Sequence, residues 1–178
     1  MYKHMANYVY IATSLDGYIA TTNGGIDWLT EIPNPDNSDY GFSEFIEKID
    51  AIIMGRNTYK KVLSFNEWPY IKKVFVLSNS LKKVSKRTEE KAEIIHGELK
   101  SVLTDLNRKG YHNLYIDGGK VIQSFLQEDL IDEMIITRIP VLLGEGIPLF
   151  GKLKKPLRFT EVKTEILNDL LVKSYYKR

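Results

Sequence analysis

Two adjacent glycines, Gly118 and Gly119, separate an apolar run from a segment with helical spacing of apolar residues in the stretch NLYIDGGKVIQSFL at 113–126. At the carboxyl end of a strand in an α/β sheet, glycines let backbone N–H groups approach a phosphate. The helix that follows then directs the positive end of its dipole at the anion. A tight turn without a ligand explains the glycines as well, because short glycine motifs often occur without a function.

Two further strand ends carry groups that suit an anion. After the apolar run AIIM, the chain continues with a glycine and three polar residues: Gly55, Arg56, Asn57 and Thr58. The run VFVL is followed by Ser78, Asn79 and Ser80. Taken alone, each could be the start of an ordinary surface helix or a polar turn. Together the three strand ends indicate a nucleotide-sized site, although neither a Walker loop nor a GxGxxG fingerprint is present.

The apolar pattern alternates between short runs typical of buried strands and segments with helical spacing. We expect strands at 7–14, 51–55, 72–80, 93–97 and 113–119, and helices at 42–49, 98–110 and 121–128, with another helix starting near Arg56. Three more strands are expected at 133–144, 157–167 and 170–178, the last two joined as a hairpin at Asn168-Asp169. This order predicts an α/β fold with a mostly parallel sheet that ends in an antiparallel hairpin.

Composition narrows the classes of function. The 178 residues suffice for a single domain with its own core. A net charge of +2 with mixed signs gives no reason to expect a nucleic-acid partner. Without cysteine there can be no disulfide, thiolate catalysis or cysteine-bound zinc, and the three scattered histidines suggest no metal site. No run of 18 apolar residues occurs, so we expect a cytoplasmic protein without membrane contact.

Five segments in order resemble the dihydrofolate reductase superfamily: SLDGYIA (14–20), MGRNTY (54–59), VLSNS (76–80), IDGGKVIQSFL (116–126) and IPVLLGEGIPLF (139–150). The closer likeness is to the reductase domain of the bifunctional riboflavin-biosynthesis deaminase–reductase and its stand-alone relatives, over nearly the whole chain. The resemblance implies a three-layer α/β fold with helices on both faces of the sheet. It also implies one domain over 1–178, with 1–6 as a flexible extension, and a homodimer.

The same resemblance implies hydride transfer from NADPH and assigns the cofactor contacts. The cofactor diphosphate would be held by Gly55, Arg56, Asn57 and Thr58, and the adenosine ribose with its 2′-phosphate by Ser78, Asn79 and Ser80. The nicotinamide side of the diphosphate would be held by Asp117, Gly118, Gly119, Lys120 and Val121. In this family a cis peptide joins the two glycines, which would mark a functional site.

Two departures from the family pattern bear on function. Folate reductases usually have an arginine where this chain has Asn79, so a preference for NADPH over NADH would need charge from Lys60, Lys61 or Lys82. Because the sequence contains no cysteine, we expect no deaminase half with a cysteine-bound zinc centre.

The expected substrate is a small heterocycle, pterin-like or ribosylamino-pyrimidine-like. Asp39 is the expected catalytic carboxylate, since it stands just ahead of the helix at 42–49 and partial burial would raise its pKa. Asp39 could instead only cap that helix. Asp16, Trp28 and Phe42 are the expected substrate-binding residues, with turn chemistry or core packing as the alternatives. The predicted protein is an NADPH-dependent reductase, and an NADPH-binding module without reductase activity or a true dihydrofolate reductase are the alternatives.

Overall fold

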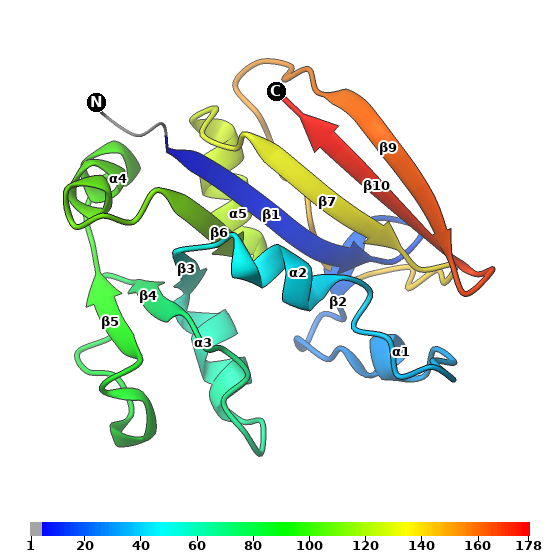
Figure 1. Ribbon diagram of the computed structural model, residues 1–178, viewed down its shortest axis with the longest axis horizontal. Coiled ribbons are helices and arrows are strands. Elements are labelled where there is room, and N and C mark those ends of the chain that lie inside the picture. Colours follow the sequence, from blue (N-terminus) through cyan, green and yellow to red (C-terminus); the bar gives the residue numbers. More distant parts are fainter. Residues whose placement is uncertain (1–4) are drawn as a thin grey trace.

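The computed structural model describes residues 5–178 and is built around one eight-stranded sheet, in the order β5-β4-β3-β6-β1-β7-β10-β9 (Figure 1). The strands of this sheet are β1 Ala6–Thr13, β3 Ala51–Gly55, β4 Lys73–Leu77, β5 Ala92–Ile95, β6 Asn113–Asp117, β7 Glu133–Arg138, β9 Thr160–Leu167 and β10 Leu171–Lys177. A separate two-stranded ribbon pairs β2 (Tyr18–Ala20) with β8 (Ile147–Pro148). The helices are α1 Asp27–Thr30, α2 Phe42–Glu47, α3 Arg56–Leu63, α4 Leu99–Arg108 and α5 Gly119–Gln127, with a 3-10 turn at Lys86–Thr88.

The strand directions confirm the expected sheet. All neighbouring pairs from β5 to β7 are parallel, whereas β10 pairs antiparallel with both β7 and β9. The turn between β9 and β10 has positive φ angles at Asn168 and Asp169, which these two residue types tolerate better than most. The α/β fold with an antiparallel C-terminal hairpin is therefore the one that the sequence predicts.

Helices cover both faces of the sheet, as expected. Successive side chains of a strand point to opposite faces. Ile52 and Met54 of β3 pack in one core with residues of α2 and with Tyr59 of α3. Ile53 packs in a second core with residues of α4 and α5. In Figure 1, α2 crosses in front of the sheet and α5 lies behind it. Because both faces of β3 are buried, its sequence is a continuous apolar run rather than an alternating one.

The structure differs from the expected elements at several boundaries, and the strands expected at 72–80, 93–97 and 157–167 run over Lys73–Leu77, Ala92–Ile95 and Thr160–Leu167. The strand expected at 133–144 ends at Arg138, since Pro140 has no N–H for a sheet ladder and Leu142 is exposed. The N-terminal extension was expected to reach residue 6, but Ala6 is already the first residue of β1. Residues 1–4 of this extension lie outside the described residues. The short elements α1, β2 and β8 contain too few residues to show a period in the sequence.

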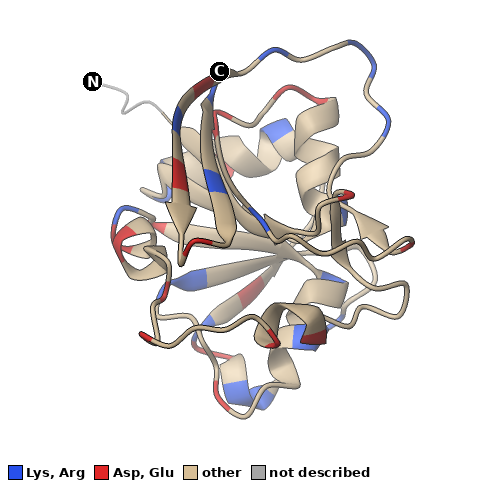
Figure 2. Ribbon diagram, turned by 90° about the vertical axis from the view of Figure 1, so that its right-hand side faces the viewer, with Lys and Arg blue, Asp and Glu red and all other residues tan. Residues whose placement is uncertain are grey.

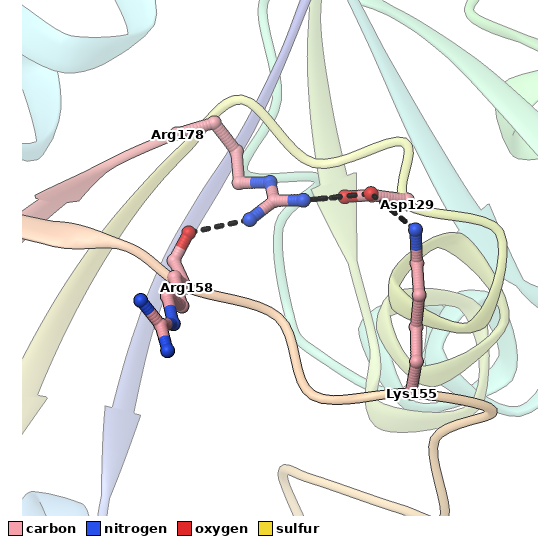
Figure 3. A network of polar contacts seen from close by, with 4 residues as sticks. All are labelled: Asp129, Lys155, Arg158 and Arg178. Atoms are coloured by element: carbon pink, nitrogen blue, oxygen red, sulfur yellow. Dashed lines mark hydrogen bonds and ion pairs between the residues drawn. The ribbon is translucent and has the colours of Figure 1, made fainter.

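The end of the chain is tied to the body of the domain by its last residue (Figure 3). The Arg178 guanidinium donates to both carboxylate oxygens of Asp129, at 2.5 and 2.6 Å, and to the carbonyl of Arg158. It also lies over the ring of Phe159, and Lys155 approaches the same carboxylate at 4.0 Å. These contacts hold β10 against the segment that leads into β9.

Charges of both signs are spread over the elements seen in Figure 2, with Lys and Arg recurring along the long loop before β9. Within residues 5–178, no helix is both long enough and apolar enough to span a membrane.

Candidate functional site

A cleft of about 850 Å³ opens at the carboxyl ends of β3, β4 and β6, where α3 and α5 begin. This is the edge of an α/β sheet at which ligands bind. The structure places most of the expected cofactor residues in the cleft wall: Gly55, Arg56, Asn57, Thr58, Ser78, Ser80, Asp117, Gly118, Gly119, Lys120 and Val121. Asn79 is exposed and does not line the cleft.

Two helix N-termini meet in this cleft. Neither α3 nor α5 has a side-chain hydrogen bond at its N-cap, so the N–H groups of both first turns remain available to a ligand. The two helix starts touch, because a Cβ added to Gly118 would lie 2.1 Å from Thr58 Oγ1. Paired helix dipoles and N–H groups favour a bound anion at this point.

The backbone at the glycine pair differs from the one expected. Among the described residues there is no cis peptide bond, and Gly118 instead has a φ of +86°, a conformation that favours glycine. A Cβ added to Gly119 would meet Ile19 Cδ1 at 2.8 Å. A Cβ at Gly118 would therefore collide with Thr58, whereas one at Gly119 would meet only the end of the Ile19 side chain, and the approach of a cofactor to this pair stays a prediction.

Three cations line the cleft, and all come from the two helices. Arg56 starts α3 and donates to Ser80 Oγ at 2.6 Å, which links the ends of β3 and β4. Lys61 on α3 and Lys120 on α5 are the other two. Of the lysines that could replace a missing arginine at position 79, Lys61 lies in the cleft wall, whereas Lys60 and Lys82 do not.

Three aromatic rings that pack together also line the cleft. The Phe42 ring packs edge-on against Tyr10 and Tyr115, with centroid distances of 5.5 and 6.3 Å. Phe42 is held there because the preceding carbonyl of Tyr40 accepts two hydrogen bonds, from Tyr10 Oη at 2.6 Å and from Lys173 Nζ at 2.7 Å. The structure thus places Phe42 in the cleft, as expected of a substrate-binding residue.

A carboxyl group stands between these two parts. Asp117 ends β6 and lines the cleft, and its Oδ2 accepts a hydrogen bond from Tyr70 Oη at 3.0 Å. Burial raises the pKa of the Asp117 carboxyl, while the hydrogen bonds from Tyr70 and from the Gly118 N–H offset part of that rise. Burial and the nearby Asp117 carboxyl raise the pKa of Tyr70 in turn. A carboxyl that keeps its proton more readily than usual is suited to proton transfer.

Asp39 does not have the environment expected of it. Its side chain is exposed, lies outside the cleft wall and accepts hydrogen bonds from the N–H groups of Gly41 and Ser43, both at 2.8 Å. Hydrogen bonds from Ser43 and Gly41 lower the pKa of Asp39 to about 2, so the expected rise is wrong. These contacts belong to a residue that caps the start of α2, the alternative already open in the sequence.

The other two expected substrate residues also lie outside the cleft wall. Asp16 binds Ser14 Oγ at 2.6 Å and the N–H groups of Leu143 and Gly144, so it joins two loops. Trp28 sits on α1 with an indole N–H that has no partner among the described residues, while its neighbours Ile26 and Leu29 line the cleft. A four-residue helix was too short to reveal which of its sides faces inward.

Several cleft residues had no signal in the sequence. Tyr70 lies in an irregular segment, and only the structure shows that it reaches Asp117. Tyr10 and Tyr115 stand inside strands, where aromatic residues are common for packing reasons alone. Within the described residues, no three histidine, aspartate or glutamate side chains gather as metal ligands.

The fold has the architecture of dihydrofolate reductase. A dihydrofolate reductase from Enterococcus faecalis, complexed with NADP(H) and RAB-propyl, shares the fold with a TM-score of 0.68 and 15% identity, over 100% of this chain and 99% of that one. At this identity the likeness concerns the fold alone.

The family model of the RibD C-terminal domain matches residues 8–172, and the chain belongs to this family. It is similar to a putative riboflavin biosynthesis protein from Shewanella sp. PV-4, with 54% identity and a TM-score of 0.95 over 98% of this chain and 99% of that one. It also shares the fold of a diaminohydroxyphosphoribosylaminopyrimidine deaminase/5-amino-6-(5-phosphoribosylamino)uracil reductase from Thermotoga maritima, with 20% identity and a TM-score of 0.73 over 98% of this chain and 57% of that one. These matches confirm the family resemblance.

Proposed function

We propose that the protein is an NADPH-dependent reductase of a small heterocycle. One observation carries the proposal: two uncapped helix N-termini and the three cations Arg56, Lys61 and Lys120 face a single cleft that also contains a buried carboxyl. The family and the NADP(H) bound by the E. faecalis reductase of the same fold support it.

The residues present fit the phosphates of NADPH. The first-turn N–H groups of α3 and α5 would bind the diphosphate, with Thr58 and Gly118 holding the two helix starts together. Arg56, fixed by its hydrogen bond to Ser80, and Lys61 would supply positive charge for the remaining phosphate on the β4 side. When bound there, NADPH would supply a hydride.

The substrate would occupy the aromatic part of the cleft. Tyr10, Phe42 and Tyr115 offer flat apolar surfaces against which a heterocycle can stack, and their fixed packing would orient it. Reduction of a C=N or similar bond also requires a proton. Asp117 is the cleft carboxyl whose pKa is raised, so we assign to it the role of proton donor or substrate anchor in place of Asp39.

Two measurements test this function in sequence. Calorimetric titration with NADPH should show saturable binding that weakens at high salt, because the contacts are between charged groups. Consumption of NADPH is then followed with a panel of pterins, pyrimidines and quinones. Binding together with turnover of a panel member supports a reductase, while binding without turnover of any of them favours a module that only senses the nucleotide. Absence of NADPH binding would refute the proposal.

A further inference from the structure

The charges in the cleft are distributed unevenly along the chain. Among residues 5–178, the charged residues in the cleft wall are Arg56, Lys61, Asp117 and Lys120, and every cleft residue from this part of the chain that precedes Gly55 is uncharged. We take this uncharged set, together with Tyr115, as the substrate side: Tyr10, Ile11, Ala12, Ile19, Ala20, Gly24, Ile26, Leu29 and Phe42. From this distribution we infer that the substrate is a flat heterocycle that carries no phosphate. The inference rests on the proposed reductase function.

The cations available in the cleft are matched to the cofactor. NADPH carries a diphosphate and a 2′-phosphate, and the cleft offers three cations and two helix N-termini, all on α3 and α5. A phosphate on the substrate, bound at the aromatic rings, would lose its hydration and would find no cation or helix N-terminus in return. This loss is strongly unfavourable. Proteins that bind phosphate use these two kinds of group for that reason.

Lys173 lies beside the Tyr10 ring but is engaged in a hydrogen bond with the backbone. Lys173 is 4% exposed, its Nζ donates to the Tyr40 carbonyl at 2.7 Å, and it lies outside the cleft wall. Its ammonium group lies 5.1 Å from the centre of the Tyr10 ring and 5.2 Å from that of Tyr175, and the charged groups of Glu165, Lys163, Glu44 and Asp39 also act on it. Reaching a substrate phosphate would require Lys173 to abandon the contact that holds the chain ahead of Phe42.

The T. maritima protein of the same fold is named for a phosphoribosylamino substrate. On this inference the present chain differs from that protein in the substrate it accepts.

The test compares matched pairs of ligands that differ by one phosphate. With NADPH at saturation, calorimetry measures binding of 5-amino-6-ribosylaminouracil and its 5′-phosphate, and of 6-hydroxymethylpterin and its phosphate ester. At least one phosphate-free member should bind, about tenfold or more tightly than its ester, because the ester loses hydration without gaining a cation. Its affinity should also change little with salt, since no ionic contact forms. An ester that binds as tightly as its partner, or no binding of either phosphate-free ring, would overturn the inference.

The variant Lys173→Met tests whether Lys173 binds a substrate phosphate. If Lys173 binds no phosphate, the variant should keep the ratio of affinities within each pair to within about twofold, whatever happens to the absolute values. A selective loss of affinity for the ester would assign the phosphate to Lys173 and overturn the inference. Titration of the wild type with NADPH alone distinguishes failure of the reductase proposal from failure of the inference about the substrate. If NADPH does not bind, the reductase proposal is refuted. If NADPH binds and the phosphate ester is preferred, only the inference about the substrate class is refuted.

Discussion

Replacing Asp117 by asparagine should separate catalysis from stability, because the wild-type carboxyl is buried in the cleft. The amide has nearly the same shape, and the Tyr70 hydroxyl, 3.0 Å from Oδ2, can accept as well as donate a hydrogen bond. The variant should therefore fold and bind NADPH to within about twofold of the wild type. Turnover should fall by about 10² to 10⁴, the usual span for a lost acid–base group, which corresponds to about 3–5 kcal/mol in the barrier.

Stability should change in the opposite direction. Burial raises the pKa of Asp117 above its ordinary value of 3.8, so the folded protein holds a proton that the unfolded chain releases. Wild-type stability contributed by this proton is fully present below pH 3.8 and is lost as the pH rises through the folded pKa. Asp117→Asn, which cannot ionise, should thus melt higher than the wild type at neutral pH and lose this advantage on acidification.

The assay is thermal unfolding across pH together with steady-state kinetics on a substrate found in the panel. Asp36→Asn, an exposed aspartate outside the cleft, is the matched control and should change neither quantity. Wild-type turnover by Asp117→Asn would refute the assignment of the proton donor. A variant that melts lower than the wild type at neutral pH would refute the account of its burial.

Three further predictions concern the cofactor and the helix starts. Gly118→Ala should lose about 1–3 kcal/mol of unfolding free energy from its positive φ alone, and more from the contact with Thr58; denaturant unfolding should show a larger loss than for Gly17→Ala, where φ is also +86° but no atom lies within 4 Å. A loss no larger than that of the control would contradict the contact. Arg56→Ala should weaken NADPH binding by about 1.5–3 kcal/mol, or one to two decades in the dissociation constant, and the loss should be smaller at high salt. Arg108→Ala, at an exposed position on α4, is the control. An unchanged dissociation constant at low salt would show that Arg56 is not part of the site. Asp39→Asn should keep turnover within about twofold of the wild type. Because the pKa of Asp39 is lowered to about 2, the wild type should be more stable than the variant above pH 3.8 and should lose this advantage as the pH falls from 3.8 to about 2. A collapse of turnover would restore Asp39 as the catalytic group.

The central strands of the sheet could be predicted from the sequence because they are buried on both faces. A run such as AIIMG has no alternation, so length and flanking polar residues identified it as a strand. The anion-binding part of the cleft followed from the same reasoning, since the groups concerned stand immediately after strand ends and the topology brings parallel strand ends to one edge.

The substrate part could not be predicted in the same way. Tyr10, Tyr70 and Tyr115 come from segments far apart in sequence, and aromatic residues in strands indicate packing as readily as binding. Asp39 misled the prediction because a carboxylate ahead of a helix has the same sequence whether it caps the helix or enters a cleft, and only its bonds to Gly41 and Ser43 distinguish the two. A homodimer and a cytoplasmic location stay predictions, the first open to sedimentation analysis.

The most direct test of the central claim is an NMR titration of the isotopically labelled protein with NADPH, followed through its backbone amides. Saturable shifts should be largest in the first turns of α3 and α5, at 55–58 and 118–121, with a second group at 78–80. The amides of the lysine-bearing loop at 150–158 should move little, although its charge would attract any anion weakly. Shifts confined to that loop, or no saturable shifts at the two helix starts, would contradict the account.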